Sequence, residues 1–263
     1  MQARAVQVLR IVRLALHLAR GLVTAALLFP FDSLERRRVR IRCWSARLLA
    51  ILRLHLRVHG SVQTDRPLML VSNHVSWLDI FAIDAIIPVR FVAKSEVRAW
   101  PLLGWLSARS GTLFIDRTRR RDVTRINAEV GQALGSGEVF AVFPEGTTSD
   151  GSSVLPFYGA LLAPAIAVNA AVQPVAIRYT RYDGSLCIEA AFDGDKTFWD
   201  TVRAITSQRA IHVDLFFLDT VPHAARHRRH LAVELRRSIA RTLERRAPHT
   251  RAARASDPGA AAR

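Results

Sequence analysis

The sequence predicts an α/β protein with a mixed, mostly parallel sheet flanked by helices and an N-terminal helical hairpin at a membrane interface. From about residue 54, short runs rich in Val, Ile, Leu and Phe alternate with helical stretches, which is typical of a sheet with helices on its faces. The chain has 263 residues and is 50% hydrophobic, which is enough for one sizeable core. Its net charge of +16 is concentrated at the two ends of the chain.

The first 31 residues predict a helix that ends at Pro30. Its uncharged stretch Gly21–Phe31 is too short to cross a bilayer core of about 30 Å. Four cationic positions fall on one narrow stripe at helical spacing, and this pattern is typical of a helix lying in a membrane interface. An amphipathic helix packed on the protein's own core is the alternative. The cationic positions are Arg10, Arg13, His17 and Arg20.

A second helix is expected from about Leu34 to Leu54, with Ser33 as its N-cap. It begins with the basic run Glu35–Arg38, so residues 1–54 form a hairpin with a basic rim. Clustered arginines beside an apolar helix indicate binding to anionic lipid, and each contributes about 1 kcal/mol near a charged membrane surface.

Residues 55–247 are expected to form the α/β domain, and residues 248–263 a disordered tail. The long uncharged stretch Gly151–Ile177 could cross a membrane, but its prolines and amides favour a buried helix followed by a buried strand. Expected strands are Leu54–His59, Pro67–Val71, Val89–Ala93, Thr112–Ile115, Val139–Phe143, Val172–Tyr179, Leu186–Ala190 and Ile211–Leu218. Expected helices are Trp77–Ile87, Arg119–Leu134, Phe157–Val168 and His223–Arg246.

The charge divides into +10 over residues 1–57, −2 over 58–220 and +8 over 221–263. A nucleic-acid-binding protein is expected to carry its charge on the folded module that reads the groove, so this distribution favours an anionic membrane surface and no nucleic acid. Cys43 and Cys187 stand alone, which indicates a reducing compartment with neither a disulfide framework nor a zinc site. We expect no bound metal and no cofactor.

A histidine follows the expected strand Pro67–Val71, at a position where open α/β sheets bind ligands. If the next helix starts near Ser76, Asp79 in its first turn can reach back to His74. A carboxylate on one imidazole nitrogen fixes the tautomer and leaves the other nitrogen free as a general base. The alternative is a capping box formed by Ser76 and Asp79, which needs no chemistry.

Two further strand ends carry polar residues. The strand Val139–Phe143 leads into a carboxylate, a glycine and several hydroxyls over residues 145–151, although such residues also form turns for local reasons. The strand Thr112–Ile115 leads to Arg117, which is suited to a phosphate or is a simple surface arginine.

Taken together, these strand ends resemble the glycerolipid acyltransferase family, typified by 1-acyl-glycerol-3-phosphate acyltransferase with its HxxxxD motif. The resemblance covers roughly residues 55–220. Four sequence blocks in this order are specific to the family, whereas an HxxxxD motif by itself is weak evidence for it. Its four blocks are Asn73-His74-x4-Asp79, Gly111-x-x-Phe114-Ile115-Asp116-Arg117, Phe143-Pro144-Glu145-Gly146-Thr147 and Pro174-Val175-Ala176-Ile177.

The resemblance implies a membrane-associated O-acyltransferase of phospholipid biosynthesis at the inner face of the cell membrane. His74 would be the general base and Asp79 its orienting partner. The donor would be the thioester acyl-CoA or acyl-ACP (acyl carrier protein), with no acyl-enzyme. Asn73 and Lys94 are possible substrate contacts. The acceptor-binding residues implied by the family are Arg117, Glu145, Gly146, Thr147 and Thr148.

Thr148 departs from the family pattern, because phosphate-type members usually have Arg after Phe-Pro-Glu-Gly-Thr. Losing a guanidinium removes a bidentate anion contact. The sequence around Thr148 resembles the branch that includes lyso-ornithine lipid acyltransferases, in which a 3-hydroxy acyl group accepts the chain, and Asp150 could face their cationic head. We expect lysophosphatidic acid as the first acceptor and lyso-ornithine lipid as the second. A non-catalytic lipid-binding scaffold is a further alternative.

Overall fold

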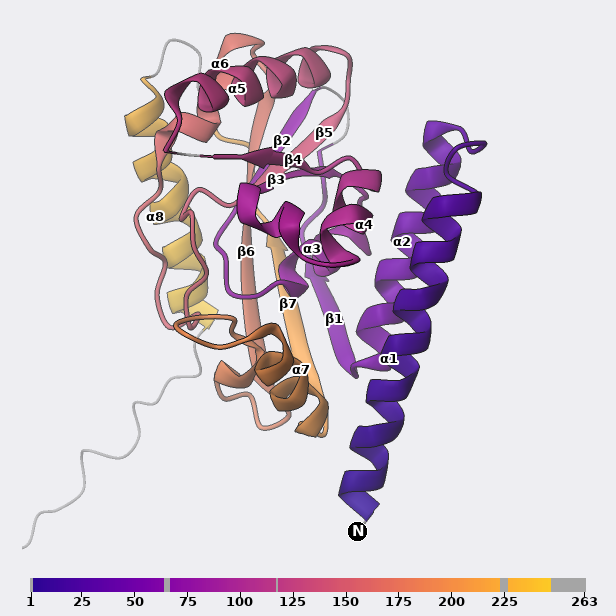
Figure 1. Ribbon diagram of the computed structural model, residues 1–263. Helices are drawn as coiled ribbons and strands as arrows, with labels where there is room; N and C mark the ends of the chain where they lie inside the picture. The colour runs from indigo at the N-terminus through magenta and orange to yellow at the C-terminus, as the bar shows by residue number, and fades with distance from the viewer. Residues whose placement is uncertain (1, 64–66, 117, 223–226, 247–263) are drawn as a thin grey trace, which may run out of the picture.

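The computed structural model describes residues 2–63, 67–116, 118–222 and 227–246 (Figure 1). Within these ranges a seven-stranded sheet forms the centre of the molecule, in the order β1-β7-β6-β2-β5-β3-β4. The strands are β1 (Leu54–His59), β2 (Leu68–Ser72), β3 (Arg90–Lys94), β4 (Leu113–Ile115), β5 (Val139–Val142), β6 (Ala171–Arg181) and β7 (Ile211–Phe217).

Neighbouring strands in this sheet run parallel except for β6 and β7, which are antiparallel. Strand β2 lies between β6 and β5, and all five of its residues are buried because helices cover both faces of the sheet. The expected mixed, mostly parallel sheet flanked by helices is therefore confirmed.

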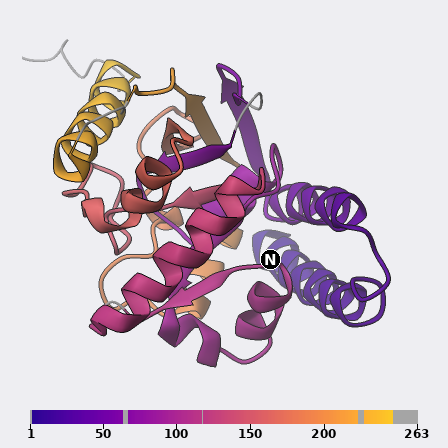
Figure 2. The same cartoon turned by 90° about the horizontal axis from the view of Figure 1, so that it is seen from above.

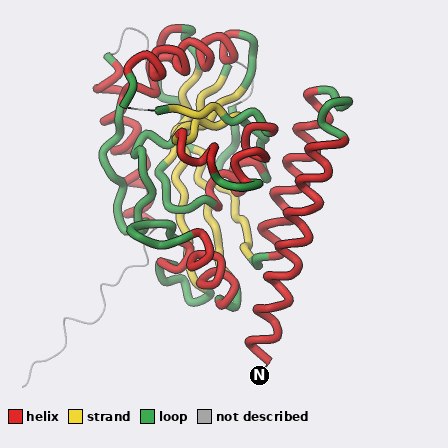
Figure 3. Tube along the Cα trace, in the orientation of Figure 1, coloured by secondary structure: helices red, strands yellow, loops and turns green. Residues whose placement is uncertain are grey.

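Helices α1, α2, α3 and α7 pack against one face of the sheet, and α5, α6 and α8 pack against the other. The view from above shows the α1–α2 pair and α8 on opposite sides of the molecule (Figure 2), and most connections are short loops (Figure 3). The α-helices are α1 (Gln2–Leu27), α2 (Leu34–Ile51), α3 (Leu78–Asp84), α4 (Leu103–Arg109), α5 (Arg120–Gly135), α6 (Ala163–Ala167), α7 (Phe198–Ser207) and α8 (Arg228–Arg246).

The N-terminal hairpin is joined to the rest of the protein by a line of inward-facing residues on α1. Arg10 is 7% exposed, and its Nη1 donates to the carbonyl oxygens of Thr206 and Gln208 at 2.9 and 2.6 Å. His17 stacks on Trp44 of α2 with ring centroids 4.6 Å apart. The cationic stripe expected on α1 is therefore divided, because Arg10 and His17 face the protein.

The outward face of α1 is largely apolar, whereas its inward face buries Arg10 and His17 together with Leu14 and Ala25. Arg13 and Arg20, the other two members of the stripe, are exposed beside this face. The exposed apolar residues of the hairpin include Val12, Leu16, Val23, Leu27 and Phe31, at 48%, 66%, 57%, 61% and 86% of their full exposure.

The hairpin helices pack closely at Gly21. A Cβ atom at this position would come within 2.6 Å of Nε1 of Trp44, so only glycine lets α1 approach α2 here. Ser33 caps α2 as expected, since its side chain accepts a hydrogen bond from the Arg36 amide. No helix within the described ranges is both long enough and apolar enough to cross a membrane.

The segment expected as a strand at Leu186–Ala190 is not one. It makes a single bridge from Leu186 to Thr180 and then turns into a 3-10 helix, Ile188–Ala190, because its amides bond to nearby carbonyls. Helices α4 and α7 were not expected from the sequence. Thr197 and Asp200 form a capping box at the start of α7, and this pattern is visible in the sequence.

Helix α8 forms the second basic end of the described chain. Its inward side is apolar, whereas its arginines face outward or lie at its edges. The expected start of this helix at His223, and the tail expected to be disordered at residues 248–263, lie outside the described residues. The apolar residues that α8 buries are Leu231, Ala232, Leu235, Ile239 and Leu243.

Candidate active site

His74 and Asp79 meet where the chain leaves β2 and enters α3. Nδ1 of His74 lies 2.8 Å from Oδ2 of Asp79. The Asp79 side chain is fully buried, whereas the His74 side chain is 20% exposed. Because Asp79 engages Nδ1, the tautomer with its hydrogen on Nδ1 leaves the Nε2 lone pair free to accept a proton.

Three other donors fix the Asp79 carboxylate. Oδ2 accepts from the amides of Val75 and Ser76 at 2.7 and 3.0 Å, and Oδ1 accepts from the Tyr179 hydroxyl at 2.7 Å. Burial raises the pKa of Tyr179 well above its usual value, so its hydroxyl stays protonated as a donor. The orientation of the carboxylate, and with it that of the His74 ring, is thus set by the surrounding fold.

The capping box expected as an alternative is only half formed. The Ser76 amide donates to Asp79, but the buried Ser76 hydroxyl has no hydrogen-bond partner in the described part of the chain. Since one carboxylate binds both the helix start and the imidazole, the capping and chemical interpretations are compatible here.

Glu145 follows β5 and links the second loop to the first. Its Oε1 accepts from the His74 amide at 2.8 Å, and its Oε2 accepts from the Leu155 amide at 3.0 Å. Burial raises the pKa of this carboxyl to about 7. Both oxygens therefore bind main chain, including the residue expected as the base. Direct acceptor binding by Glu145 stays a prediction.

Asn73 joins β2 to β6 through its side chain. Its Nδ2 donates to the Ile177 carbonyl at 3.0 Å, and its Oδ1 accepts from the Ile177 amide at 2.8 Å. The residue is buried. A substrate contact by Asn73 also stays a prediction, and it would require these two bonds to be exchanged.

Other residues expected at the site line the same cavity as His74. They are Gly146, Thr147, Thr148 and Lys94, and the Thr148 hydroxyl donates to the Phe192 carbonyl. Lys94 is exposed at the end of β3. Arg117 lies outside the described residues.

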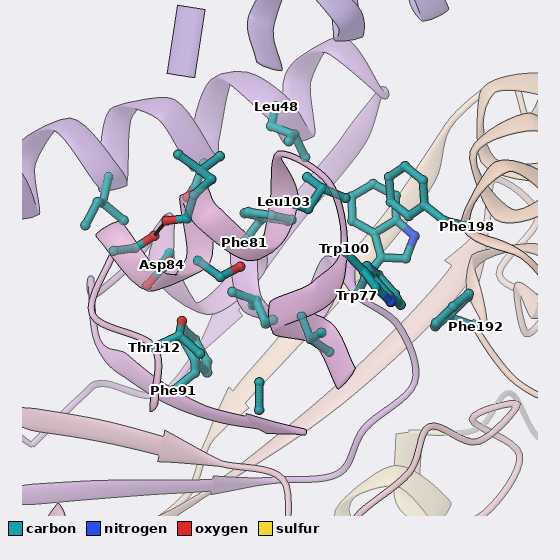
Figure 4. A pocket seen from close by; sticks show the side chains of 18 of the residues that line it. Leu48, Trp77, Phe81, Asp84, Phe91, Trp100, Leu103, Thr112, Phe192 and Phe198 are labelled. Atoms are coloured by element: carbon teal, nitrogen blue, oxygen red, sulfur yellow. Dashed lines mark hydrogen bonds between the residues drawn. The ribbon is translucent and has the colours of Figure 1, made fainter. Parts of the chain in front are cut away.

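The cavity has a volume of about 450 Å³ and lies between the hairpin and the sheet. Helices α1 to α4 and strand β3 all contribute to its wall, and most side chains there are apolar (Figure 4). The His74 ring stacks on Phe143 at 4.0 Å between centroids. The His74 imidazole therefore lies at the edge of a space suited to hydrocarbon.

Aromatic side chains gather on one side of this cavity, as Figure 4 shows. Trp100 packs edge-on against Phe192 at 6.3 Å, and Trp77 lies 5.0 Å from Phe198. These four rings come from three separate segments, so the wall forms only in the folded chain.

Comparison with known proteins identifies the family. Residues 55–178 match the family model described as Acyltransferase. A lyso-ornithine lipid O-acyltransferase of Pseudomonas aeruginosa is 38% identical over 255 residues, which cover 96% of this chain and 97% of that protein. The chain belongs to the acyltransferase family. The expected resemblance to glycerolipid acyltransferases is confirmed, and the protein is an acyltransferase.

Two further comparisons give a partial sequence match and a shared fold. A 1-acyl-sn-glycerol-3-phosphate acyltransferase of Neisseria meningitidis is 44% identical over 134 residues, covering 50% of this chain and 52% of that protein. The crystal structure of PlsC, the 1-acyl-sn-glycerophosphate (LPA) acyltransferase of Thermotoga maritima, matches with a TM-score of 0.65 at 22% identity. That match covers 91% of this chain and 97% of that chain. At 22% identity, this match shows only that the two chains share a fold.

Sequence reasoning found the acyltransferase motifs but missed several residues of the site. Tyr179 is 100 residues from Asp79 in the chain and reaches it only because β6 pairs with β2. Trp77 and Asp84 line the cavity without belonging to the quoted motifs. Within the described ranges, no three His, Cys, Asp or Glu side chains converge as metal ligands would.

Proposed function

We propose that this acyltransferase moves an acyl chain from an acyl thioester to the hydroxyl of a lysolipid, with His74 as general base. One observation carries the proposal: the His74–Asp79 pair, 2.8 Å apart, lies at the edge of an apolar cavity. A lipid-binding scaffold would have no need of a histidine held in one orientation by a buried carboxylate.

In the proposed reaction, Nε2 of His74 accepts the proton of the acceptor hydroxyl while the hydroxyl oxygen attacks the thioester carbonyl. The new C–O ester bond forms, the C–S bond breaks, and the leaving thiolate takes the proton back from the imidazolium. Asp79 stabilises that imidazolium through Nδ1.

The two cysteines do not favour a covalent intermediate. Neither Cys43 nor Cys187 is among the residues that line the cavity. Burial raises the pKa of the Cys187 thiol to about 11, so it is not a thiolate at neutral pH. Direct transfer from donor to acceptor is the simpler route.

We favour lyso-ornithine lipid as the acceptor, ahead of lysophosphatidic acid. The relative of that name from Pseudomonas aeruginosa aligns along 96% of the chain. The Thr148 hydroxyl donates to the Phe192 carbonyl and supplies no positive charge for a phosphate. The cavity wall instead includes both Lys94 and Glu96, which together suit a head group that has a carboxylate and an ammonium.

Lysophosphatidic acid is the second candidate acceptor, because the 44% identical segment belongs to a 1-acyl-sn-glycerol-3-phosphate acyltransferase. Arg117, in the block that the family uses for the acceptor head, would then bind the phosphate. Gly146 and Thr147 would contact either acceptor from the cavity wall.

We further propose that the hairpin lies on the inner face of the cell membrane as a peripheral anchor. Leu16, Leu27 and Phe31 are more than 60% exposed and would enter the lipid. Arg13 and Arg20 border this surface and would meet anionic head groups. The acyl-CoA or acyl-ACP donor would approach from the aqueous side.

Transfer of a radiolabelled acyl group from acyl-CoA or acyl-ACP to each acceptor, measured side by side, tests this function. We expect a ratio of kcat/KM that favours lyso-ornithine lipid over lysophosphatidic acid. A ratio favouring lysophosphatidic acid would reverse the acceptor assignment. Failure of both acceptors with both donors would refute lysolipid acylation.

A further inference from the structure

The wall of the cavity holds a carboxyl oxygen that a plain hydrocarbon chain leaves without a hydrogen bond. Asp84, which is 5% exposed, uses Oδ1 to accept from the Val89 amide at 3.1 Å. No described residue bonds its other oxygen. Buried polar groups are normally paired, so the second oxygen of Asp84 points to an occupant with polar character.

Asp84 differs from the other acidic residue of α3. Asp79 binds four donors, one of them the His74 ring, whereas Asp84 binds one backbone amide and borders the cavity. Figure 4 shows Asp84 on the opposite side of the view from the aromatic cluster. The two carboxyls are five residues apart, so Asp84 is about 7.5 Å further along the helix axis.

The protonation state of Asp84 indicates which chemical groups it can bind. Burial raises its pKa to about 8, so the carboxyl is mostly protonated at neutral pH and offers an O–H donor as well as acceptor oxygens. A neutral hydroxyl matches such a group. An ionised ligand group would have to lose its hydration among apolar side chains such as Leu48 and Phe91.

We propose that Asp84 is a specificity-determining residue that hydrogen-bonds a hydroxyl group carried by the acyl chain in the cavity. The assignment rests on the proposed function, because it takes the occupant to be the chain of the donor or of the lysolipid. The distance along α3 places the hydroxyl several bonds away from the reacting carbonyl.

The test compares acyl-CoA donors of one chain length that have no hydroxyl or a hydroxyl at successive positions, with lyso-ornithine lipid as acceptor. For the wild type we expect kcat/KM to be about fivefold to tenfold higher for a mid-chain hydroxyl than for the plain chain, as one added hydrogen bond allows. A second arm uses plain donors and places an additional hydroxyl on the acyl chain of the lysolipid, beyond the hydroxyl that accepts the acyl group. If only the hydroxylated lysolipid is preferred over its plain counterpart, the cavity binds the acyl chain of the acceptor and not that of the donor.

Two variants separate specificity from structure. Asp84→Asn keeps the shape, the bond to Val89 and a donor, so it should keep the preference. Asp84→Leu should bring the ratio of the two kcat/KM values to about one. A purely structural role would lower both values together and leave their ratio unchanged, because the ratio does not depend on the folded fraction.

Failure of the subsite can be distinguished from failure of the proposed function. If the plain chain is transferred but no hydroxylated donor or acceptor is preferred by the wild type, the Asp84 assignment is wrong and the acyltransferase proposal stands. If no chain of any kind is transferred, the proposed function itself fails.

Discussion

The two basic ends of the chain look alike in sequence, but the helices they form expose different side chains. Helix α8 buries leucines such as Leu235 and exposes arginines such as Arg237, as a helix on a soluble core does. Helix α1 buries Arg10 and His17 beside Leu14, and it exposes valines and leucines as well as Arg13. Positive charge in the sequence therefore does not show which helix has an apolar outward face.

The difference between the outward faces of α1 and α8 can be tested separately, because the two helices lie on opposite sides of the sheet (Figure 1). A flat membrane in contact with the outer face of α1 and α2 would be remote from α8. We therefore expect variants of the two helices to separate membrane binding from folding stability.

The largest effect is expected from charges placed on the outer face of α1. Leu16→Asp combined with Val23→Asp removes two exposed apolar side chains, each contributing about 1.5–3 kcal/mol when buried in lipid. Affinity for anionic vesicles should fall by at least about 100-fold in co-sedimentation. An affinity within threefold of wild type would show that this face does not enter the membrane.

The buried face of α8 should matter for folding. Leu235 is fully buried, so Leu235→Ala should lower the free energy of unfolding by about 2–5 kcal/mol in urea titration. Vesicle binding by the protein that remains folded should be unchanged. The matched control is Val233→Ala on the exposed side of α8, where a loss of similar size would contradict the observed packing.

Arg10 tests the unusual interior of the hairpin. Arg10→Met removes the donors to two carbonyl oxygens and should cost about 1–3 kcal/mol of stability. Arg13→Met changes an exposed arginine three residues away and should change stability by less than about 0.5 kcal/mol. Equal effects of the two substitutions on thermal unfolding would mean that the hairpin does not use Arg10 as a link to α7.

The smallest effect is expected at the outer arginines of α8. Arg237→Gln combined with Arg241→Gln should leave vesicle affinity within twofold of wild type, because both residues are exposed on α8, which lies on the other side of the molecule from the hairpin. A loss of affinity comparable to that of the α1 variant would place α8 at the membrane and remove the distinction between the two ends.

The sheet and the acyltransferase motifs could be predicted because their signals are local. Buried parallel strands such as β2 and β5 read as short apolar runs, and His74 and Asp79 are only five residues apart. Arrangements over long sequence separations could not be predicted. Tyr179 reaches Asp79 through strand pairing, and Glu145 binds the His74 amide across 71 residues.

The orientation of α1 could not be predicted from the sequence for a different reason. Helical periodicity shows which residues share a face, but not which face meets the protein. Arg10 turns inward because the carbonyls at the end of α7 need donors, and Trp44 of α2 takes up the His17 ring. These partners become neighbours only after folding.

The central claim is that His74 acts as the general base of acyl transfer, and a single-turnover assay of His74→Ala tests it most directly. The variant should fold as the wild type does, judged by near-UV circular dichroism and urea unfolding, while the rate of acyl transfer to lyso-ornithine lipid falls by about 10²–10⁴-fold. A folded His74→Ala protein that transfers the acyl group within threefold of the wild-type rate would contradict the account.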